Sequence, residues 1–214
     1  MVTKILLIGS GAREHAIARA ISRSTKEKEV YCLATNLNPG IADLCNELIV
    51  ADINAPDVVK EYAQKHSIDF AIIGPENPLA NGIADVLSDI DIGSIGPKKD
   101  LAQIETSKAF TRDLLTEYKI PGSPKYKTFN SMEGVKNFLE DLGENYVVKF
   151  DGLAGGKGVK VAGDHLRSHK EAVAYCGEII SGGGEFVIEK KLIGQEFSLM
   201  SFCDGKHLSH MPAV

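Results

Sequence analysis

The chain contains no tryptophan, no low-complexity tract, no internal repeat and no Cys-x-x-Cys pair. Its four cysteines, Cys32, Cys45, Cys176 and Cys203, are not clustered with histidines. The sequence therefore predicts neither a disulfide framework nor a thiolate metal centre. We interpret the cysteines as reduced, mostly buried small hydrophobic residues of a cytoplasmic protein.

Positive charge is not in excess either. The chain has 24 Lys and Arg against 29 Asp and Glu, a net charge of −5, so no basic surface predicts nucleic-acid binding. No apolar run approaches the roughly 20 residues that a membrane-spanning helix needs. The opening residues, MVTKILLIGSG, lack the apolar length and cleavage site of a signal peptide. We expect neither a nucleic-acid partner nor a membrane partner, and a cytoplasmic location.

What is present is an ordinary globular composition over 214 residues, 43% of them hydrophobic, enough for one large domain or two modest ones. Over the first hundred residues, apolar runs alternate with segments of helical spacing. The predicted strands are 4–8, 30–34, 47–51, 70–73 and 92–95. Repeated strand–helix units indicate an α/β fold with a doubly wound parallel sheet. Ligands of such sheets lie at the carboxyl ends of the strands.

The pattern changes after residue 105. A helix is predicted from Ser107 to about Tyr118, and the segment IPGSP at 120–124 ends it. The following pattern is α+β, with helices near 135–142 and 172–180. Strands are predicted at 146–150, 159–162, 186–189, 197–203 and 206–210. We therefore expect a domain boundary near 105–122 and a second domain that looks unfinished.

A glycine turn, Gly9-Ser10-Gly11-Ala12-Arg13-Glu14, follows the first predicted strand. It begins like a dinucleotide-binding fingerprint, but Glu14 stands where the third glycine belongs. The second predicted strand ends in Ala34-Thr35-Asn36, which offers no acid to a ribose 2′-hydroxyl, so we reject NAD and an oxidoreductase. Backbone N–H groups at a helix start still bind anions, and Arg13 can pair with a phosphate. A purely structural turn fits the sequence equally well.

A second glycine-rich segment reads Asp151-Gly152-Leu153-Ala154-Gly155-Gly156-Lys157-Gly158-Val159. It is not a P-loop, because Asp151 and Gly158 replace the required glycine and hydroxyl residue, and predicted strands lie on both sides. Such a loop can fold over a triphosphate as a mobile flap, with backbone donors and Lys157 as a point charge. A flexible hairpin loop is the plainer alternative, and the lysine among the glycines favours the flap.

Lys149 interrupts an otherwise apolar predicted strand. With a period of two, Val147 and Lys149 share one strand face. A buried lysine is costly unless an anion meets it, so we predict that Lys149 faces a phosphate. The alternative is a lysine that reaches solvent. Lys108, in the first turn of a predicted helix, is a weaker signal.

Two carboxylates flank the junction between the predicted strands at 186–189 and 197–203. Glu189 closes the first strand and Glu196 opens the second. Backbone groups between them can pair with an adenine edge, and the acceptor oxygens of Glu196 can bind ribose hydroxyls. A charged β-turn with no ligand is the alternative interpretation, because it would show the same spacing of Glu189 and Glu196.

Together these segments resemble the ATP-grasp superfamily and, within it, the glycinamide ribonucleotide synthetase (phosphoribosylamine–glycine ligase) family. The resemblance covers the whole chain and rests on four stretches in the family's order. These are IGSGAREHA at 8–16, IGPENPL at 73–79, SKAFT at 107–111 and VKFDGLAGGKGV at 148–159. The first and the last are the specific ones.

The resemblance implies a Rossmann-like substrate domain over 1–105 and a truncated ATP-grasp domain over 106–214. It implies that ATP phosphorylates the carboxylate of glycine, and that the amine of 5-phosphoribosylamine attacks the glycyl phosphate. The products would be glycinamide ribonucleotide, ADP and phosphate, in de novo purine synthesis. ATP and Mg²⁺ (or Mn²⁺) are the implied cofactors.

The resemblance also implies residue roles. Lys108 and Lys149 would contact phosphates, Glu189 and the Leu192 backbone would frame the adenine, and Glu196 would hold the ribose. The implied ATP-binding residues are Lys108, Lys149, Gly155, Gly156, Lys157, Gly158, Val159, Glu189, Lys190, Leu192 and Glu196. Those implied for phosphoribosylamine are Gly9, Gly11, Arg13, Glu14 and Glu76.

The chain departs from the family pattern in several places. Many members of the family have glycine where Ala12 stands and alanine where Gly155 stands, and both exchanges are small. Ile41 stands after Pro39-Gly40 where asparagine is usual, which puts a substrate contact at that position in question. The family continues past the position of Val214 with its magnesium-binding Glu and Asn. We therefore expect the chain to be a fragment, inactive alone, with its own missing C-terminal part as a partner. Coupled ADP release with glycine and fresh phosphoribosylamine tests this expectation.

Two alternatives stay open. The chain can belong to another ATP-grasp carboxylate–amine ligase, which a substrate panel would reveal. It can also be a non-catalytic nucleotide-binding module that works only with a partner chain. Capture of a complementing C-terminal polypeptide would support that second alternative.

Overall fold

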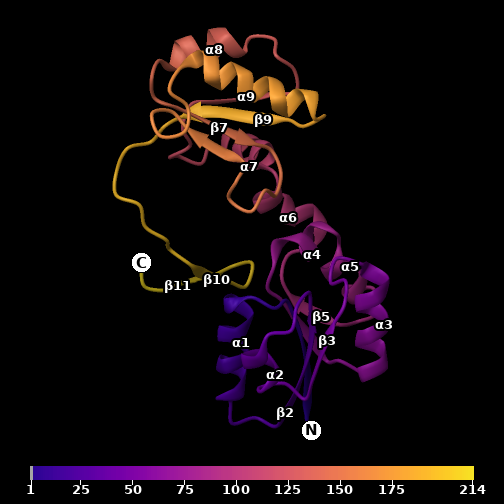
Figure 1. Ribbon diagram of the computed structural model, residues 1–214. Helices are drawn as coiled ribbons and strands as arrows, with labels where there is room; N and C mark the ends of the chain where they lie inside the picture. The colour runs from indigo at the N-terminus through magenta and orange to yellow at the C-terminus, as the bar shows by residue number, and fades with distance from the viewer. Residues whose placement is uncertain (1) are drawn as a thin grey trace.

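Two bodies make up the computed structural model, which describes residues 2–214 (Figure 1). The first, coloured indigo to magenta, is built on a five-stranded sheet, and the second, coloured orange, on a four-stranded sheet. The yellow C-terminal segment leaves the second body and runs down beside the first (Figure 1).

The five-stranded sheet is parallel throughout, in the order β3-β2-β1-β4-β5. Its strands are β1 (Thr3–Ile8), β2 (Lys28–Ala34), β3 (Glu47–Val50), β4 (Phe70–Ile73) and β5 (Gly93–Ile95). The order reverses between β1 and β4, which places the switch point of the sheet at their carboxyl ends.

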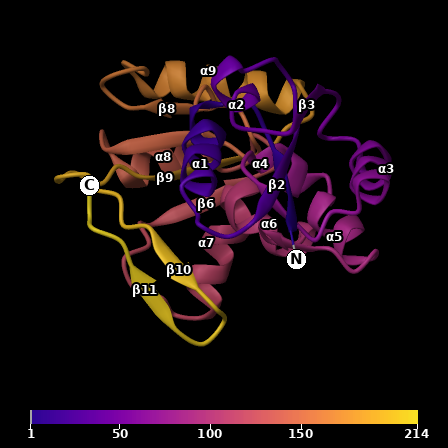
Figure 2. The ribbon, with the colours of Figure 1, turned by 90° about the horizontal axis from the view of Figure 1, so that it is seen from below.

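Helices cover both faces of this sheet, because its strands are apolar on both sides. On one face, α1 (Ala12–Ser22) and α2 (Pro39–Ala42) pack on Leu7 and Cys32. On the other, α3 (Pro56–His66) and α5 (Ile83–Ser88) pack on Leu6 and Ile8. Figure 2 shows α1 and α2 on one side and α3 on the other. The predicted doubly wound α/β domain is confirmed.

The four-stranded sheet is antiparallel, in the order β6-β9-β7-β8. Its strands are β6 (Tyr126–Phe129), β7 (Tyr146–Phe150), β8 (Val159–Val161) and β9 (Phe186–Lys190). Two helices, α8 (Val135–Leu142) and α9 (His169–Ser181), cover one face over a core that contains Tyr146, Val148, Phe186 and Ile188. The α+β character predicted for the second half of the chain is confirmed.

Helices between the two sheets depart from the sequence-based expectation. Residues 76–88 form two helices, α4 (Glu76–Ala80) and α5, because Gly82 takes a left-handed conformation with φ +81° between them. Helix α6 (Lys99–Thr106) was not predicted, whereas α7 (Lys108–Glu117) begins at its Ser107 cap as predicted.

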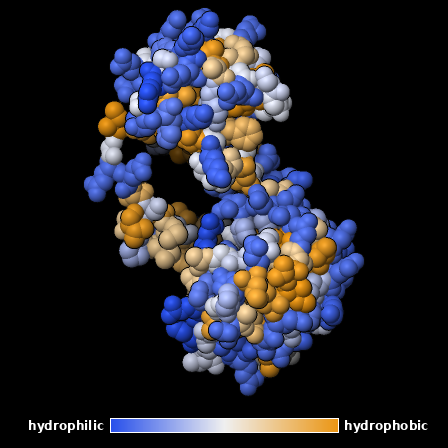
Figure 3. Space-filling model, in the orientation of Figure 1, coloured by the Kyte–Doolittle hydropathy of each residue, from blue (hydrophilic) through white to orange (hydrophobic). Residues whose placement is uncertain are grey.

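The C-terminal segment has no core of its own. Every residue from 192 to 214 is exposed, and its regular structure is one short hairpin, β10 (Ser201–Cys203) with β11 (Leu208–His210). The strand predicted over 197–203 is therefore right only for its last three residues. Figure 3 shows hydrophobic side chains along this segment. An isolated two-stranded hairpin is marginally stable in water, and this one buries none of its side chains.

All four cysteines are free. Cys32 and Cys176 are buried, and burial raises the pKa of the Cys176 thiol to about 12. Cys45 is half-buried, and Cys203 is exposed on the hairpin. Within the described residues, no helix has both the length and the apolar character that crossing a bilayer requires.

Candidate active site

One face of the antiparallel sheet carries two charged side chains. In the β7–β9 register, Val147 pairs with Glu189 and Lys149 with Val187, so these side chains point away from the helix-covered core. Helix α7 packs against β9 and brings a third charge, Arg112, to the carboxylate of Glu189.

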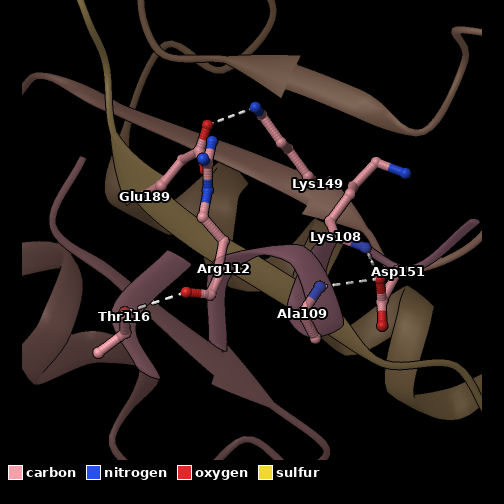
Figure 4. A network of polar contacts seen from close by, with 7 residues as sticks. All are labelled: Lys108, Ala109, Arg112, Thr116, Lys149, Asp151 and Glu189. Atoms are coloured by element: carbon pink, nitrogen blue, oxygen red, sulfur yellow. Dashed lines mark hydrogen bonds and ion pairs between the residues drawn. The ribbon is translucent and has the colours of Figure 1, made fainter. Parts of the chain in front are cut away.

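Arg112, Glu189 and Lys149 form one ion network (Figure 4). Arg112 Nε donates to Glu189 Oε2 at 2.8 Å, and Arg112 Nη2 forms an ion pair with the same oxygen at 2.8 Å. Lys149 Nζ pairs with Glu189 Oε1. Glu189 is only 6% exposed, against 20% for Arg112 and 24% for Lys149. The anion predicted opposite Lys149 is therefore a carboxylate of the chain itself, and two cations surround it.

Asp151 joins the glycine-rich segment to the start of α7. Its Oδ1 accepts hydrogen bonds from the backbone N–H groups of Lys108 (2.5 Å) and Ala109 (3.2 Å), and its Oδ2 accepts from the Ser107 hydroxyl (2.9 Å). A carboxylate at a helix start meets unpaired N–H groups and the positive end of the helix dipole. Figure 4 shows Asp151 beneath the first turn of α7.

The glycine loop, residues 151–158, connects β7 to β8 as the sequence predicts. Gly152, Gly155 and Gly156 all have positive φ, which other residues adopt only with strain. Lys108 Nζ donates to the Gly152 carbonyl at 2.8 Å, so its ammonium lies at the base of the loop. Lys157 is exposed within it.

A cleft of about 460 Å³ lies between the two bodies. Arg13, Glu76 and Glu105 line it from the first body and its following helix. Lys108, Gly155 and Gly156 line it from the second body. The cleft therefore brings together the two glycine-rich segments that the sequence singled out separately.

The front turn has two differently placed charged residues. Arg13 is 66% exposed and pairs with Glu76 Oε1 at 2.8 Å, and it also donates to the Gly74 carbonyl at 3.2 Å. The hydrogen bond from Arg13 to Glu76 lowers the pKa of the Glu76 carboxyl. Glu14, in contrast, is buried and accepts from the Gly11 N–H at 2.6 Å. Arg13 is accessible to a ligand, whereas Glu14 caps α1.

A smaller cavity, about 300 Å³, opens at the carboxyl ends of β1, β2 and β4, the edge at which doubly wound sheets bind ligands. Ser10 and Thr35 meet there through their hydroxyls, 2.9 Å apart, and Asn38 donates to the Ser10 carbonyl at 2.9 Å. Gly11, Pro75 and Asn77 also line it. The loops that follow β1, β2 and β4 therefore meet at one edge of the sheet.

The remaining predicted ATP-site residues lie outside this network. Lys190, Leu192 and Glu196 are exposed at and beyond the end of β9. A larger cavity, about 640 Å³, is lined in part by Tyr146. The Tyr146 side chain points to the opposite face of the sheet from Lys149, so this cavity is separate from the ion network. Nowhere in residues 2–214 do three or more His, Cys, Asp or Glu side chains gather to hold a metal ion.

Arg112 and Asp151 were missed by sequence reasoning. Their partners lie 77 and 43 residues away along the chain, and spacing carries no signal over such distances. One local signal existed for Arg112, which stands four residues after Lys108 and so shares its helix face.

Two family profiles together cover the chain. "Phosphoribosylglycinamide synthetase, N domain" matches residues 3–105, and "Phosphoribosylglycinamide synthetase, ATP-grasp (A) domain" matches residues 106–214. The chain is 47% identical to phosphoribosylamine–glycine ligase of Methanococcus vannielii, over 99% of the chain and 49% of that protein. Identity to the ligase of Methanobrevibacter smithii is 45%, over 99% of the chain and 48% of that protein. The chain spans about half the length of the curated relatives it matches.

Solved structures share the fold. Phosphoribosylamine–glycine ligase from Thermotoga maritima superposes with a TM-score of 0.78 at 24% identity, covering 99% of the chain and 49% of that structure. N5-carboxyaminoimidazole synthetase from Staphylococcus aureus, complexed with ADP, has a TM-score of 0.75 at 17% identity, covering 99% and 53%. D-alanine–D-alanine ligase from Bacillus anthracis, complexed with ATP, has a TM-score of 0.69 at 19% identity, covering 99% and 65%.

Proposed function

The chain belongs to the phosphoribosylglycinamide synthetase family, and from that premise we propose that it is the ATP-holding part of a ligase that joins glycine to 5-phosphoribosylamine. The single observation that carries this proposal is the cleft that places Arg13 and Glu76 opposite Lys108 and the glycine loop. A phosphorylated amine bound at the front turn would there face a nucleotide bound on the antiparallel sheet. The division between the two units is proposed at 105/106, at the end of α6.

ATP would lie on the sheet face that carries Lys149 and Glu189. The half-buried Val159 and Val161 beside them offer an apolar surface to the nucleotide. Lys108 and Lys149 supply positive charge, and the glycine loop from Gly155 to Val159 supplies N–H donors over the phosphates. Lys190, Leu192 and Glu196, at the end of β9, would hold the adenine and ribose together with Glu189. Two structural neighbours are described as complexed with ADP and with ATP.

The proposed reaction has two steps. The carboxylate oxygen of glycine attacks the γ-phosphorus of ATP, and ADP leaves. The amine of 5-phosphoribosylamine then attacks the carbonyl carbon of glycyl phosphate, phosphate leaves, and the nitrogen loses a proton. Both steps need in-line placement, neutralisation of phosphate charge and exclusion of water from the acyl phosphate. The cations at the cleft meet the second need.

Mg²⁺ accompanies ATP in enzymes of this chemistry, bound through phosphates and one or two carboxylates. Among residues 2–214, no three His, Cys, Asp or Glu side chains gather at one point. No step of the proposed reaction is routed through the metal.

Arg13 gives a test that separates this ligase from other carboxylate–amine ligases. We expect the chain to bind glycinamide ribonucleotide, the proposed product, and Arg13→Ala to weaken that binding about tenfold to a hundredfold, because a charge-assisted phosphate contact is lost. Isothermal titration calorimetry with the purified chain measures both affinities.

Arg19→Ala is the matched control, because Arg19 is an exposed arginine of the same helix. It should bind the ribonucleotide as tightly as the unaltered chain. A chain that binds ATP but not glycinamide ribonucleotide would favour another ATP-grasp ligase. If Arg13→Ala and Arg19→Ala lost the same affinity for glycinamide ribonucleotide, Arg13 would not be a residue of the proposed site.

A further inference from the structure

Resting on the proposed function, we propose that Arg112 is a positioning residue. It keeps the buried carboxylate of Glu189 paired and thereby allows Lys149 to turn to the phosphates of the nucleotide. Arg112 itself need not touch the nucleotide. The observation behind this proposal is that the two cations bind different oxygens of one carboxylate (Figure 4).

The charges of the three side chains do not cancel. Arg112 and Lys149 contribute two positive charges and Glu189 one negative charge, so the network carries a net charge of +1. Glu189 is 6% exposed, and a buried carboxylate needs a partner. With Arg112 on Oε2, departure of Lys149 from Oε1 leaves the carboxylate still paired. Lys149 is therefore the exchangeable member of the network.

Without Arg112, the network would lose its excess positive charge. Glu189 and Lys149 would then form a neutral pair, and Lys149 could reach a phosphate only by leaving the buried carboxylate alone. Removing one member of a buried ion pair is strongly unfavourable. Lys149 would stay with Glu189, and the sheet face would lose the positive charge that attracts a triphosphate.

Several contacts hold Arg112 in place. Its Nε donates to Glu189 Oε2 and its Nη2 forms an ion pair with the same oxygen, and a planar guanidinium holds such a geometry better than a lysine does. Its backbone belongs to α7, whose start Asp151 and Ser107 cap, and its carbonyl accepts from the Thr116 hydroxyl at 3.0 Å. Lys149, on a single ammonium contact, has fewer constraints.

The test compares ATP with adenosine, which lacks phosphates. We expect Arg112→Met to weaken ATP binding about tenfold to a hundredfold, the equivalent of one charge-assisted phosphate contact, while adenosine affinity changes less than about threefold. Lys125→Met, which removes a lysine from the exposed pair with Asp141, should leave both affinities unchanged. Calorimetry gives the affinities, and circular dichroism confirms that each variant is folded.

Rescue separates positioning from a structural role. In the double variant Arg112→Met with Glu189→Gln, the carboxylate charge is gone and Lys149 is free, so ATP affinity should return to within about threefold of Glu189→Gln alone. Should Arg112→Met not fold, Arg112→Gln replaces it in the same comparison.

Each outcome decides the proposal. A selective loss of ATP binding that Glu189→Gln restores supports it. An unchanged ATP affinity in Arg112→Met overturns it and leaves the proposed function standing. Equal loss of ATP and adenosine, or no rescue, assigns Arg112 a structural role. An unaltered chain that does not bind ATP overturns the proposed function, and the role of Arg112 falls with it.

Discussion

Replacement of Gly9 by alanine is expected to lower the free energy of unfolding of the first body by about 2–5 kcal/mol. Gly9 has φ +126°, a backbone conformation that strains any residue with a side chain. An added Cβ would also lie 2.6 Å from Glu14 Cγ and 2.9 Å from Glu14 Oε2. Glu14 is buried and holds the Gly11 N–H, so it cannot move aside without uncapping α1. Hydrogen exchange of β1 amides under increasing urea measures the loss.

Two comparisons isolate the causes. Gly82→Ala combines a positive φ of +81° with ordinary contacts of 3.7 Å or more, and should cost about 1–2 kcal/mol from backbone strain alone. In a Glu14→Ala background, the cost of Gly9→Ala should fall to a similar value. A loss below about 0.5 kcal/mol for Gly9→Ala, the range of ordinary surface changes, would contradict this reading of the turn.

Asp151→Ala is expected to destabilise the second body by about 2–4 kcal/mol, because three hydrogen bonds to a charged acceptor at the start of α7 are lost together. The same change should weaken ATP binding about tenfold, since Lys108 and the base of the glycine loop lose their common anchor. Lys108 Nζ donates to Gly152, the residue that follows Asp151, so the two effects have one origin. Urea denaturation followed by circular dichroism and an ATP titration measure them.

Asp151→Asn is the matched control. An amide oxygen still accepts hydrogen bonds at a helix start, so stability should fall only by about 0.3–1 kcal/mol, the contribution of charge near the helix dipole. Equal losses in the Asn and Ala variants would mean that charge, rather than the hydrogen bonds, holds α7 to the loop. If neither variant lost stability, Asp151 would not be the anchor between α7 and the glycine loop.

The parallel sheet was predictable because its strands are short apolar runs separated by helical spacing. The strands 70–73 and 146–150 lie where the pattern places them. Helix α6 was not predictable in this way, since only Ala102 of its eight residues is buried and Leu101 and Ile104 are exposed. Strand β6 was not predicted for a related reason: it has only four residues and lies at a sheet edge, so its sequence shows little alternation of apolar and polar residues.

In the candidate site, too, some residues could be predicted from local sequence and others could not. Lys149 was predictable because a lysine inside an apolar strand requires an anion, yet the pattern cannot say which anion. Glu189 meets it across the β7–β9 pairing, and Arg112 meets Glu189 from a helix 77 residues earlier. Such contacts depend on tertiary packing. The converse case is the segment 197–203, where strand-forming residues lack a partner sheet and only Ser201–Cys203 form a strand.

The measurement that tests the account most directly is calorimetric titration of the chain with Mg-ATP, beside Lys149→Ala. The account predicts saturable binding by the chain and a loss of about tenfold or more in the variant, because one charge-assisted phosphate contact disappears. Absence of binding by the chain, or equal binding by the two proteins, would contradict the assignment of the nucleotide to the face that Lys149 and Glu189 share.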